Sequence, residues 1–173
     1  MLQLNSVANV GVHRTCTPLY EKYEATPYNT FLDPSDTNNI YSGMVLYRTG
    51  PDTVSLATVT GTSYANAKPF GLSALDRNPN IDDVTQVGVN SWAVWLGGSN
   101  AFFTISAPAF DTTKSYNIDT VSGSRTLLYT ASGTGQLTSA SGSNINGVPV
   151  AELIDVISPT QIVVRLVPFG ATA

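Results

Sequence analysis

The sequence is poor in the residues that most catalytic and metal sites need. It has one cysteine, Cys16, and one histidine, His13, among 173 residues. A single cysteine excludes an internal disulfide. A zinc site normally takes three or four protein ligands, and a catalytic Cys–His pair has to meet inside a rigid pocket. We therefore interpret His13 as a solvated side chain and Cys16 as an ordinary thiol, and we predict no metal and no cofactor.

Charged side chains are also scarce, at 12% of the chain against about 25% in an average soluble domain. The 8 Lys and Arg residues form no run, and the formal net charge is −4. Nucleic-acid binding depends on clustered cations that release counterions from phosphate. We therefore predict no nucleic-acid partner. The remaining polar surface has to come from Ser, Thr, Asn and Tyr, which suits flat contacts with another protein.

Long apolar runs and leader-like segments are lacking as well. No apolar run approaches the roughly 20 residues that a membrane helix needs. Residues 1–14 show no basic region followed by an apolar one, as a secretory signal would. We expect a chain that is made in a cytoplasm, stays soluble until it joins a larger object, and has no membrane partner.

The chain is rich instead in short β-type runs separated by turns. Three pairs of runs flank a turn, and each pair predicts a hairpin: 40–48 with 53–59, 87–96 with 102–105, and 150–157 with 161–167. Weaker strands are predicted at 116–121 and 126–130. A helix over 150–157 is the main competing interpretation, although eight residues before a Ser-Pro step are few for a helix. The pattern predicts an all-β fold, a small antiparallel β-barrel or sandwich with few or no helices.

Residues 1–39 read differently from the rest, because they contain three prolines and little strict alternation. We predict an extended N-terminal arm over 1–39 and a β-barrel or sandwich domain over 40–173. The arm either docks on a neighbour or lies across its own domain. Within the domain, 107–146 is a candidate inserted loop or lobe, whose Ser/Gly-rich part 131–146 is either an exposed loop or a subunit contact. Four aromatic residues are spaced along the arm: Tyr20, Tyr23, Tyr28 and Phe31.

Few residues suggest chemistry. Asp82 and Asp83, with Asp76 nearby, could bind Ca²⁺ in a loop. Asp residues are also common in turns that bind no metal, and we favour this turn interpretation. No Gly-x-Ser-x-Gly, P-loop or His-Glu-x-x-His pattern is present. A hydrolase that uses two distant carboxylates is the remaining enzymatic alternative. We predict a protein that is not an enzyme and has no catalytic residues.

Two tryptophans lie three positions apart in a predicted strand, Trp92 and Trp95, so they point to opposite faces. One is then predicted to face the core and the other to be exposed. An exposed Trp is a candidate contact for a protein partner or a carbohydrate. The alternative is that the protein's own loops cover both.

Several segments together carry a family resemblance: Gly43-Met44-Val45-Leu46, then 54–58, Pro69-Phe70-Gly71-Leu72, 87–105 and the C-terminal 150–167. They resemble the head decoration, or capsid cement, proteins of tailed phages. The resemblance covers roughly residues 40–167 and lies in the order and type of these β-barrel segments.

The resemblance implies a structural virion protein, synthesised in the host cytoplasm, that binds the outer surface of the assembled capsid. It would cement neighbouring major capsid subunits against DNA pressure and would act as a homo-oligomer, with a trimer favoured. The alternative is a head-fibre or tail-associated module that binds a receptor or a carbohydrate. The candidate capsid contacts are Tyr20, Tyr23, Tyr28, Phe31 and Trp95.

Overall fold

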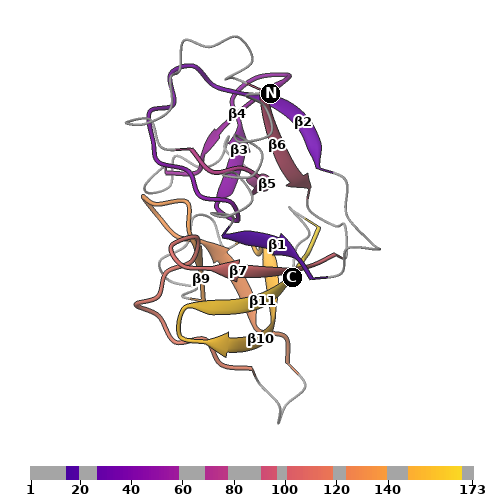
Figure 1. Cartoon of the computed structure of the whole chain (residues 1–173), viewed down its shortest axis with the longest axis vertical. Coiled ribbons are helices and arrows are strands. Elements are labelled where there is room, and N and C mark those ends of the chain that lie inside the picture. The colour runs from indigo at the N-terminus through magenta and orange to yellow at the C-terminus, as the bar shows by residue number, and fades with distance from the viewer. Residues whose placement is uncertain are drawn as a thin grey trace, which may run out of the picture.

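The computed structural model describes residues 15–19, 27–58, 69–77, 91–96, 101–118, 124–139 and 148–168. Within these ranges the protein is all-β and contains no helix (Figure 1). The predicted fold class is therefore confirmed. The strands are β1 (Cys16–Pro18), β2 (Tyr28–Leu32), β3 (Val45–Arg48), β4 (Thr53–Leu56), β5 (Pro69–Ser73), β6 (Ser91–Leu96), β7 (Phe102–Ser106), β8 (Leu127–Thr130), β9 (Leu137–Thr138), β10 (Ala151–Ser158) and β11 (Gln161–Leu166).

Five strands close into a small barrel in the order β2-β4-β3-β5-β6. β3 and β4 form the first predicted hairpin, with Leu46 opposite Leu56. All pairs are antiparallel except β2 and β4, which run parallel. Closure removes free strand edges. This matters because the protein has few charged side chains that could prevent edge-to-edge aggregation.

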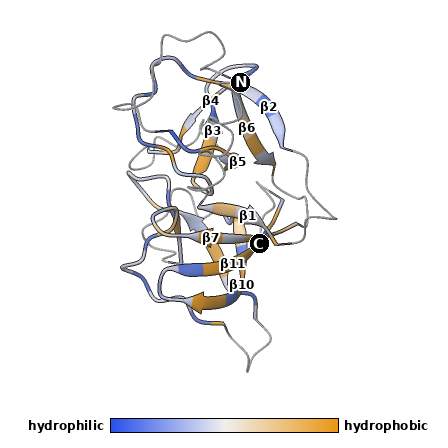
Figure 2. Ribbon diagram, viewed as in Figure 1, coloured by the Kyte–Doolittle hydropathy of each residue, from blue (hydrophilic) through white to orange (hydrophobic). Residues whose placement is uncertain are grey.

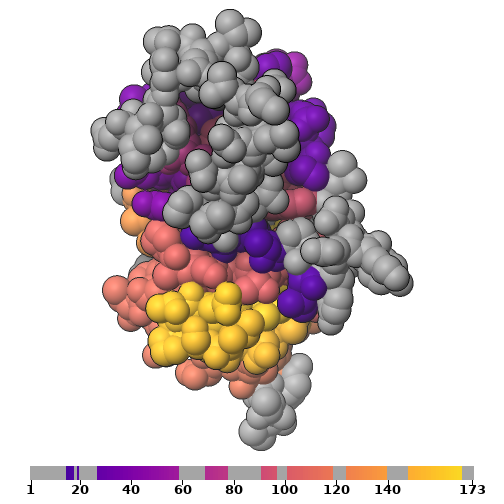
Figure 3. Space-filling view, viewed as in Figure 1, coloured from indigo at the N-terminus to yellow at the C-terminus, as the bar shows by residue number. Residues whose placement is uncertain are grey.

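The remaining six strands form a second sheet in the order β1-β7-β11-β10-β8-β9. β10 and β11 form the predicted C-terminal hairpin, so the helical interpretation of 150–157 is wrong. Ile162, Val164 and Leu166 alternate along β11 and are buried, as predicted. In the space-filling view this hairpin (yellow) forms much of the visible surface of its half of the molecule (Figure 3).

The second predicted hairpin, 87–96 with 102–105, is wrong. β6 lies in the barrel between β2 and β5, whereas β7 lies in the other sheet between β1 and β11. The chain therefore crosses from one sheet to the other after Leu96. The Gly-rich sequence at 97–100 indicates a change of direction but not the partner of the next strand.

The described parts of residues 1–39 form strands of both sheets. Cys16 in β1 lies opposite Ile105 in β7, and β2 lies between β4 and β6 in the barrel. The sequence predicted an extended arm that either docks on a neighbour or lies across its own domain, and in the described part of this region β1 and β2 pair within the two sheets. The prolines are compatible with it, because Pro18 ends a short edge strand and Pro27 precedes β2.

Residues 107–146 also contribute to the second sheet where the structure describes them. β8 pairs with β10 and β9 pairs with β8. Leu137 is fully buried and forms a bridge to Phe110. Of the predicted weaker strands, 126–130 contains β8, whereas residues 116–118 are not in a strand and 119–121 lie outside the described residues.

The barrel and the sheet share one hydrophobic core, and hydrophobic residues concentrate on strands of both, such as β3 and β10 (Figure 2). At their junction the ring of Trp95 in β6 packs on Phe103 in β7, with centroids 5.2 Å apart. The Oγ of Ser42 accepts hydrogen bonds from the backbone N–H groups of Thr15, at 2.8 Å, and Cys16, at 3.0 Å. The two sheets are therefore joined by apolar packing and by hydrogen bonds.

Gly43 lies in this junction and has to be glycine for two reasons. Its φ of +97° is in the left-handed region that other residues rarely adopt. A Cβ at this position would also lie 3.1 Å from both the Cβ of Cys16 and the Cδ1 of Ile105. The Gly-Met-Val-Leu segment of the sequence therefore turns the chain from the junction into β3.

Candidate interaction surface

Three of the five aromatic residues proposed as contacts lie in the described part of the chain, and their exposures differ. Tyr28 and Phe31 lie in β2 and are 39% and 53% exposed. Tyr20 and Tyr23 lie outside the described residues. Trp95 is 7% exposed, so its side chain is not available to a partner in this structure.

The expectation of one exposed tryptophan is wrong. Trp92 and Trp95 do lie on opposite faces of β6, but both are buried. Trp92 donates its indole N–H to the Oγ of Ser73, at 3.0 Å. The second sheet covers Trp95 through Phe103. Strand alternation predicts which face of the sheet a side chain is on, but it cannot show that another sheet covers that face. For this reason the sequence could not predict that both tryptophans are buried.

Four residues lie at the same end of the barrel, where β3 and β6 end and β2 and β5 begin, and we call Tyr28, Arg48, Phe70 and Leu96 the barrel-end patch. The rings of Tyr28 and Phe70 meet edge to face, with centroids 5.9 Å apart. The guanidinium of Arg48 lies 4.7 Å from the centroid of the Phe70 ring. Leu96 ends β6 opposite Gly71, the residue next to Phe70. Tyr28, Arg48 and Leu96 are exposed and Phe70 is partly so.

The sequence Pro-Phe-Gly-Leu in β5 positions Phe70 in this patch. A Cβ at Gly71 would lie 2.3 Å from the Cγ1 of Val94 and 2.5 Å from the backbone oxygen of Trp95. Glycine therefore lets β5 approach β6 closely. The register between β3 and β5 shifts at Leu46 and Tyr47, a bulge of the kind that redirects side chains at the rim of a barrel.

Phe31 presents a separate exposed ring on the side of the barrel. Its register partners are Thr53 in β4 and Ser91 in β6, both short polar residues. Its backbone N–H donates to the carbonyl of Asp52, at 2.9 Å. A single exposed apolar side chain is common on protein surfaces, so Phe31 adds to the aromatic surface of β2 but does not define a site.

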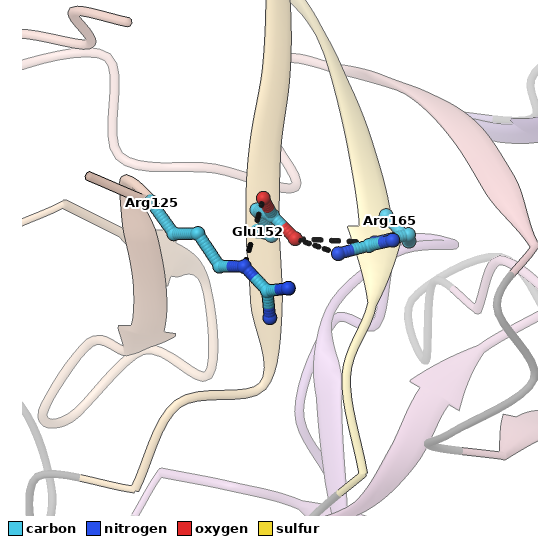
Figure 4. A network of polar contacts seen from close by, with 3 residues as sticks. All are labelled: Arg125, Glu152 and Arg165. Atoms are coloured by element: carbon cyan, nitrogen blue, oxygen red, sulfur yellow. Dashed lines mark hydrogen bonds and ion pairs between the residues drawn. The ribbon is translucent and has the colours of Figure 1, made fainter. Parts of the chain in front are cut away.

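The second sheet carries a polar cluster of a different kind. The half-buried Glu152 in β10 accepts hydrogen bonds from Arg165 in β11, and Arg125 lies 3.8 Å from its other carboxylate oxygen (Figure 4). Glu152 and Arg165 are directly opposite in the register. The group is a cross-strand pair with an added cation, and it fits a structural role because the carboxylate is satisfied on both sides.

The remaining candidates for chemistry are dispersed or outside the described residues. Cys16 is 1% exposed and belongs to the core. His13, Asp82 and Asp83 lie outside the described residues. Asp76 accepts a hydrogen bond from the backbone N–H of Ser42. Among the residues that the structure describes, no three His, Cys, Asp or Glu side chains group as ligands for a metal ion.

Two titratable groups close to the barrel rim have shifted pKa values. Hydrogen bonds from the hydroxyl and backbone N–H of Ser35 lower the pKa of Asp33. Burial raises the pKa of Tyr47, and the nearby carboxylates of Asp36 and Asp33 raise it further. Asp33 therefore stays ionised and Tyr47 neutral near pH 7. Neither shift provides a general acid or base at that pH.

The fold and the barrel-end patch define a β-barrel protein whose exposed aromatic surface suits contact with another macromolecule. A family model described as phage cement protein matches residues 2–173. The chain belongs to this family, which confirms the resemblance drawn from the sequence and implies association with the phage capsid. No curated protein and no solved structure matches the chain. A search of the described residues for a helix long and apolar enough to cross a membrane found none.

Proposed function

We propose that the protein binds the outer surface of the assembled capsid and cements neighbouring major capsid subunits, so that the shell resists the pressure of the packaged DNA. The observation that carries this proposal is the match of the cement family model to nearly the whole chain, residues 2–173. The surface composition agrees with it, since 12% charged residues favour flat, neutral contacts. Each contact can be weak, because many copies on one lattice add avidity.

The contact residues that we propose are the exposed aromatic side chains of β2. Tyr28 lies in the barrel-end patch, and Phe31 lies three residues further along the same strand. Aromatic residues supply large contact areas at low entropic cost and are enriched at protein interfaces. We retain Tyr20 and Tyr23 as proposed contacts on sequence grounds. Trp95 would become a contact only if the junction opened, and we do not include it.

We also propose that the protein acts without catalysis and as a homo-oligomer, with a trimer favoured. The support for the first is membership of a structural family. The second is tested by sedimentation equilibrium of the purified chain over a range of concentrations. A mass of three chains would agree with the proposal, and a mass of one chain at all concentrations would contradict it.

The deciding experiment is co-sedimentation of the purified protein with expanded, undecorated capsids of the phage that encodes it. We expect saturable binding at a copy number fixed by capsid geometry. Decorated shells should also release their DNA at a higher temperature than undecorated shells. Failure to bind any capsid, with the protein found only on tails or fibres, would instead support a receptor-binding module. The burial of both tryptophans removes the main observation that favoured carbohydrate binding.

A further inference from the structure

Arg48 in the barrel-end patch differs from the other arginines that the structure describes. Arg125 and Arg165 are paired with Glu152, and Arg77 donates to the carbonyl of Asp36. Within the described ranges, Arg48 makes a cation–π contact with Phe70 and no hydrogen bond or ion pair. Asp52 lies in the turn that follows β3 and is exposed. It forms no ion pair with Arg48. Among the described residues, no acceptor therefore takes up the N–H donors of the Arg48 guanidinium.

The contact with Phe70 orients this guanidinium for binding. A guanidinium held over an aromatic ring by a cation–π contact keeps N–H donors directed away from the ring, and two of them can match the two oxygens of a carboxylate. The Phe70 ring also restricts the side chain, so less rotamer entropy is lost when a carboxylate binds. The Arg48 guanidinium is thus a preoriented hydrogen-bond donor at the edge of an apolar surface.

The neighbours of Arg48 define the rest of the partner. Tyr28 lies edge to face with Phe70, and Leu96 ends the adjacent strand; both are exposed. An apolar side chain of a partner placed on Tyr28, Phe70 and Leu96 would exclude water from the patch. Exclusion of water strengthens a charge-assisted hydrogen bond at its edge.

We propose that the barrel-end patch binds a segment of the major capsid protein in which an Asp or Glu stands next to an aliphatic or aromatic side chain. The carboxylate pairs with Arg48 and the apolar side chain packs on Tyr28, Phe70 and Leu96. Charge complementarity carries the choice of partner, because no carboxylate in the described part of the chain pairs with the Arg48 cation beside Phe70. This inference rests on the proposed function and specifies the chemistry that recognises the capsid.

The test uses the full-length chain and expanded, undecorated capsids of the phage that encodes it. Arg48→Gln removes the charge, and Arg48→Lys keeps the charge but loses the planar fork. Arg125→Gln is the matched control, since the side chain of Arg125 is 67% exposed and precedes β8 of the other sheet. We expect Arg48→Gln to weaken binding about tenfold or more, as loss of a charge-assisted pair does. Arg48→Lys should fall between Arg48→Gln and the wild type, and Arg125→Gln should stay within about twofold of the wild type.

The outcomes separate this inference from the proposed function. If the wild type binds capsids and Arg48→Gln binds equally well, the inference is wrong and the cement function stands. If Arg48→Gln and Arg125→Gln weaken binding by the same factor, general electrostatics explain it, and the inference is again wrong. If the wild type binds no capsid, both proposals fail.

A chemical cross-link identifies the partner's carboxylate directly. With Arg48→Lys, a water-soluble carbodiimide should join the new amine to the neighbouring Asp or Glu as an amide, while the carbodiimide takes up the water and becomes a urea. Mass spectrometry of the decorated capsid should then show a peptide linked between position 48 and the major capsid protein. The wild type, which has no amine at position 48, is the control. Capsids saturated with Arg48→Lys but lacking any such peptide would contradict the proposal.

Discussion

Single residues stabilise this small barrel by satisfying buried backbone groups, and Asp36 shows this most clearly. Its side chain is 5% exposed and accepts hydrogen bonds from the backbone N–H of Leu56, at 2.7 Å, and of Asn38, at 2.8 Å. Its own carbonyl accepts a hydrogen bond from Arg77. One carboxylate thus holds the connection before β3 against the end of β4.

We predict that Asp36→Ala lowers the free energy of unfolding by about 2–4 kcal/mol, because it leaves the buried N–H of Leu56 and the partly buried N–H of Asn38 without their acceptor. Urea denaturation at pH 7 measures the change. Asp52→Asn is the control, since that side chain is exposed, and it should shift stability by less than about 0.5 kcal/mol. Similar midpoints for the two variants would show that Asp36 is not the acceptor described.

Trp92 and Trp95 should behave alike when truncated. Each fills part of the shared core, one inside the barrel and one at the junction. We predict that Trp92→Ala and Trp95→Ala each cost about 3–5 kcal/mol, whereas Phe31→Ala, at a 53% exposed site, costs well under half as much. Thermal melting of the three variants checks this. A small effect for Trp95→Ala would mean that the second sheet does not cover it.

Tyr116 should make the protein sensitive to alkali. Its hydroxyl donates to the carbonyls of Asp111, at 2.9 Å, and Leu137, at 3.2 Å. Burial raises its pKa well above the ordinary value, and the carboxylate of Asp111 raises it further. The folded state then keeps a proton that the unfolded state loses above about pH 10.

The stability that Tyr116 contributes is therefore fully present below about pH 10 and falls as the pH rises further. Urea denaturation between pH 8 and 11.5 should show this decline, and Tyr116→Phe should flatten it. Phenolate absorbance should show one tyrosine that ionises only as the protein unfolds. An unchanged pH slope in Tyr116→Phe would assign the decline to other groups.

At the scale of elements, the sequence predicted the pairing of strands that are neighbours in the chain but not the pairing of strands that are far apart in it. The β3–β4 and β10–β11 hairpins were predictable because alternating strands flank a short turn. The partners of β6 and β7 were not, because each pairs with strands far away in the sequence. The barrel-end patch shares this difficulty, since Tyr28, Arg48 and Phe70 come from three strands. The Pro-Phe-Gly step was the one local signal, but it entered the sequence analysis only as part of the family resemblance, and no strand was predicted there.

The strand β2 makes the N-terminal region essential to the barrel. Leu32 packs in the core, and β2 hydrogen-bonds to both β4 and β6. We predict that deletion of residues 1–39 unfolds the barrel, because the ring would lose one of its five strands. Circular dichroism and amide proton dispersion in NMR spectra measure this. Deletion of residues 1–14 alone is the comparison, and we expect it to keep the fold. A folded protein after the longer deletion would show that the barrel does not need β2 and would support an arm that docks on a neighbour.

At the scale of the whole molecule, the shared core makes the barrel and the second sheet one cooperative unit. Trp95 packs on Phe103, and the Ser42 hydroxyl binds the backbone at Thr15 and Cys16. The turn at Gly135 adds a further link, since its carbonyl accepts the N–H of Val45 at 2.8 Å. Under the proposed cement function such coupling would be useful, because force on one half of the protein would be carried by both.

We predict a single unfolding transition for the two halves. Tryptophan fluorescence reports the barrel and the junction, because both tryptophans are in β6, while far-ultraviolet circular dichroism reports all strands. Coincident denaturation curves are the result expected of one cooperative unit. Phe103→Ala should weaken the coupling, so that the fluorescence transition shifts away from the dichroism transition. Two separate transitions in the wild type would show that the barrel and the second sheet do not unfold as one cooperative unit.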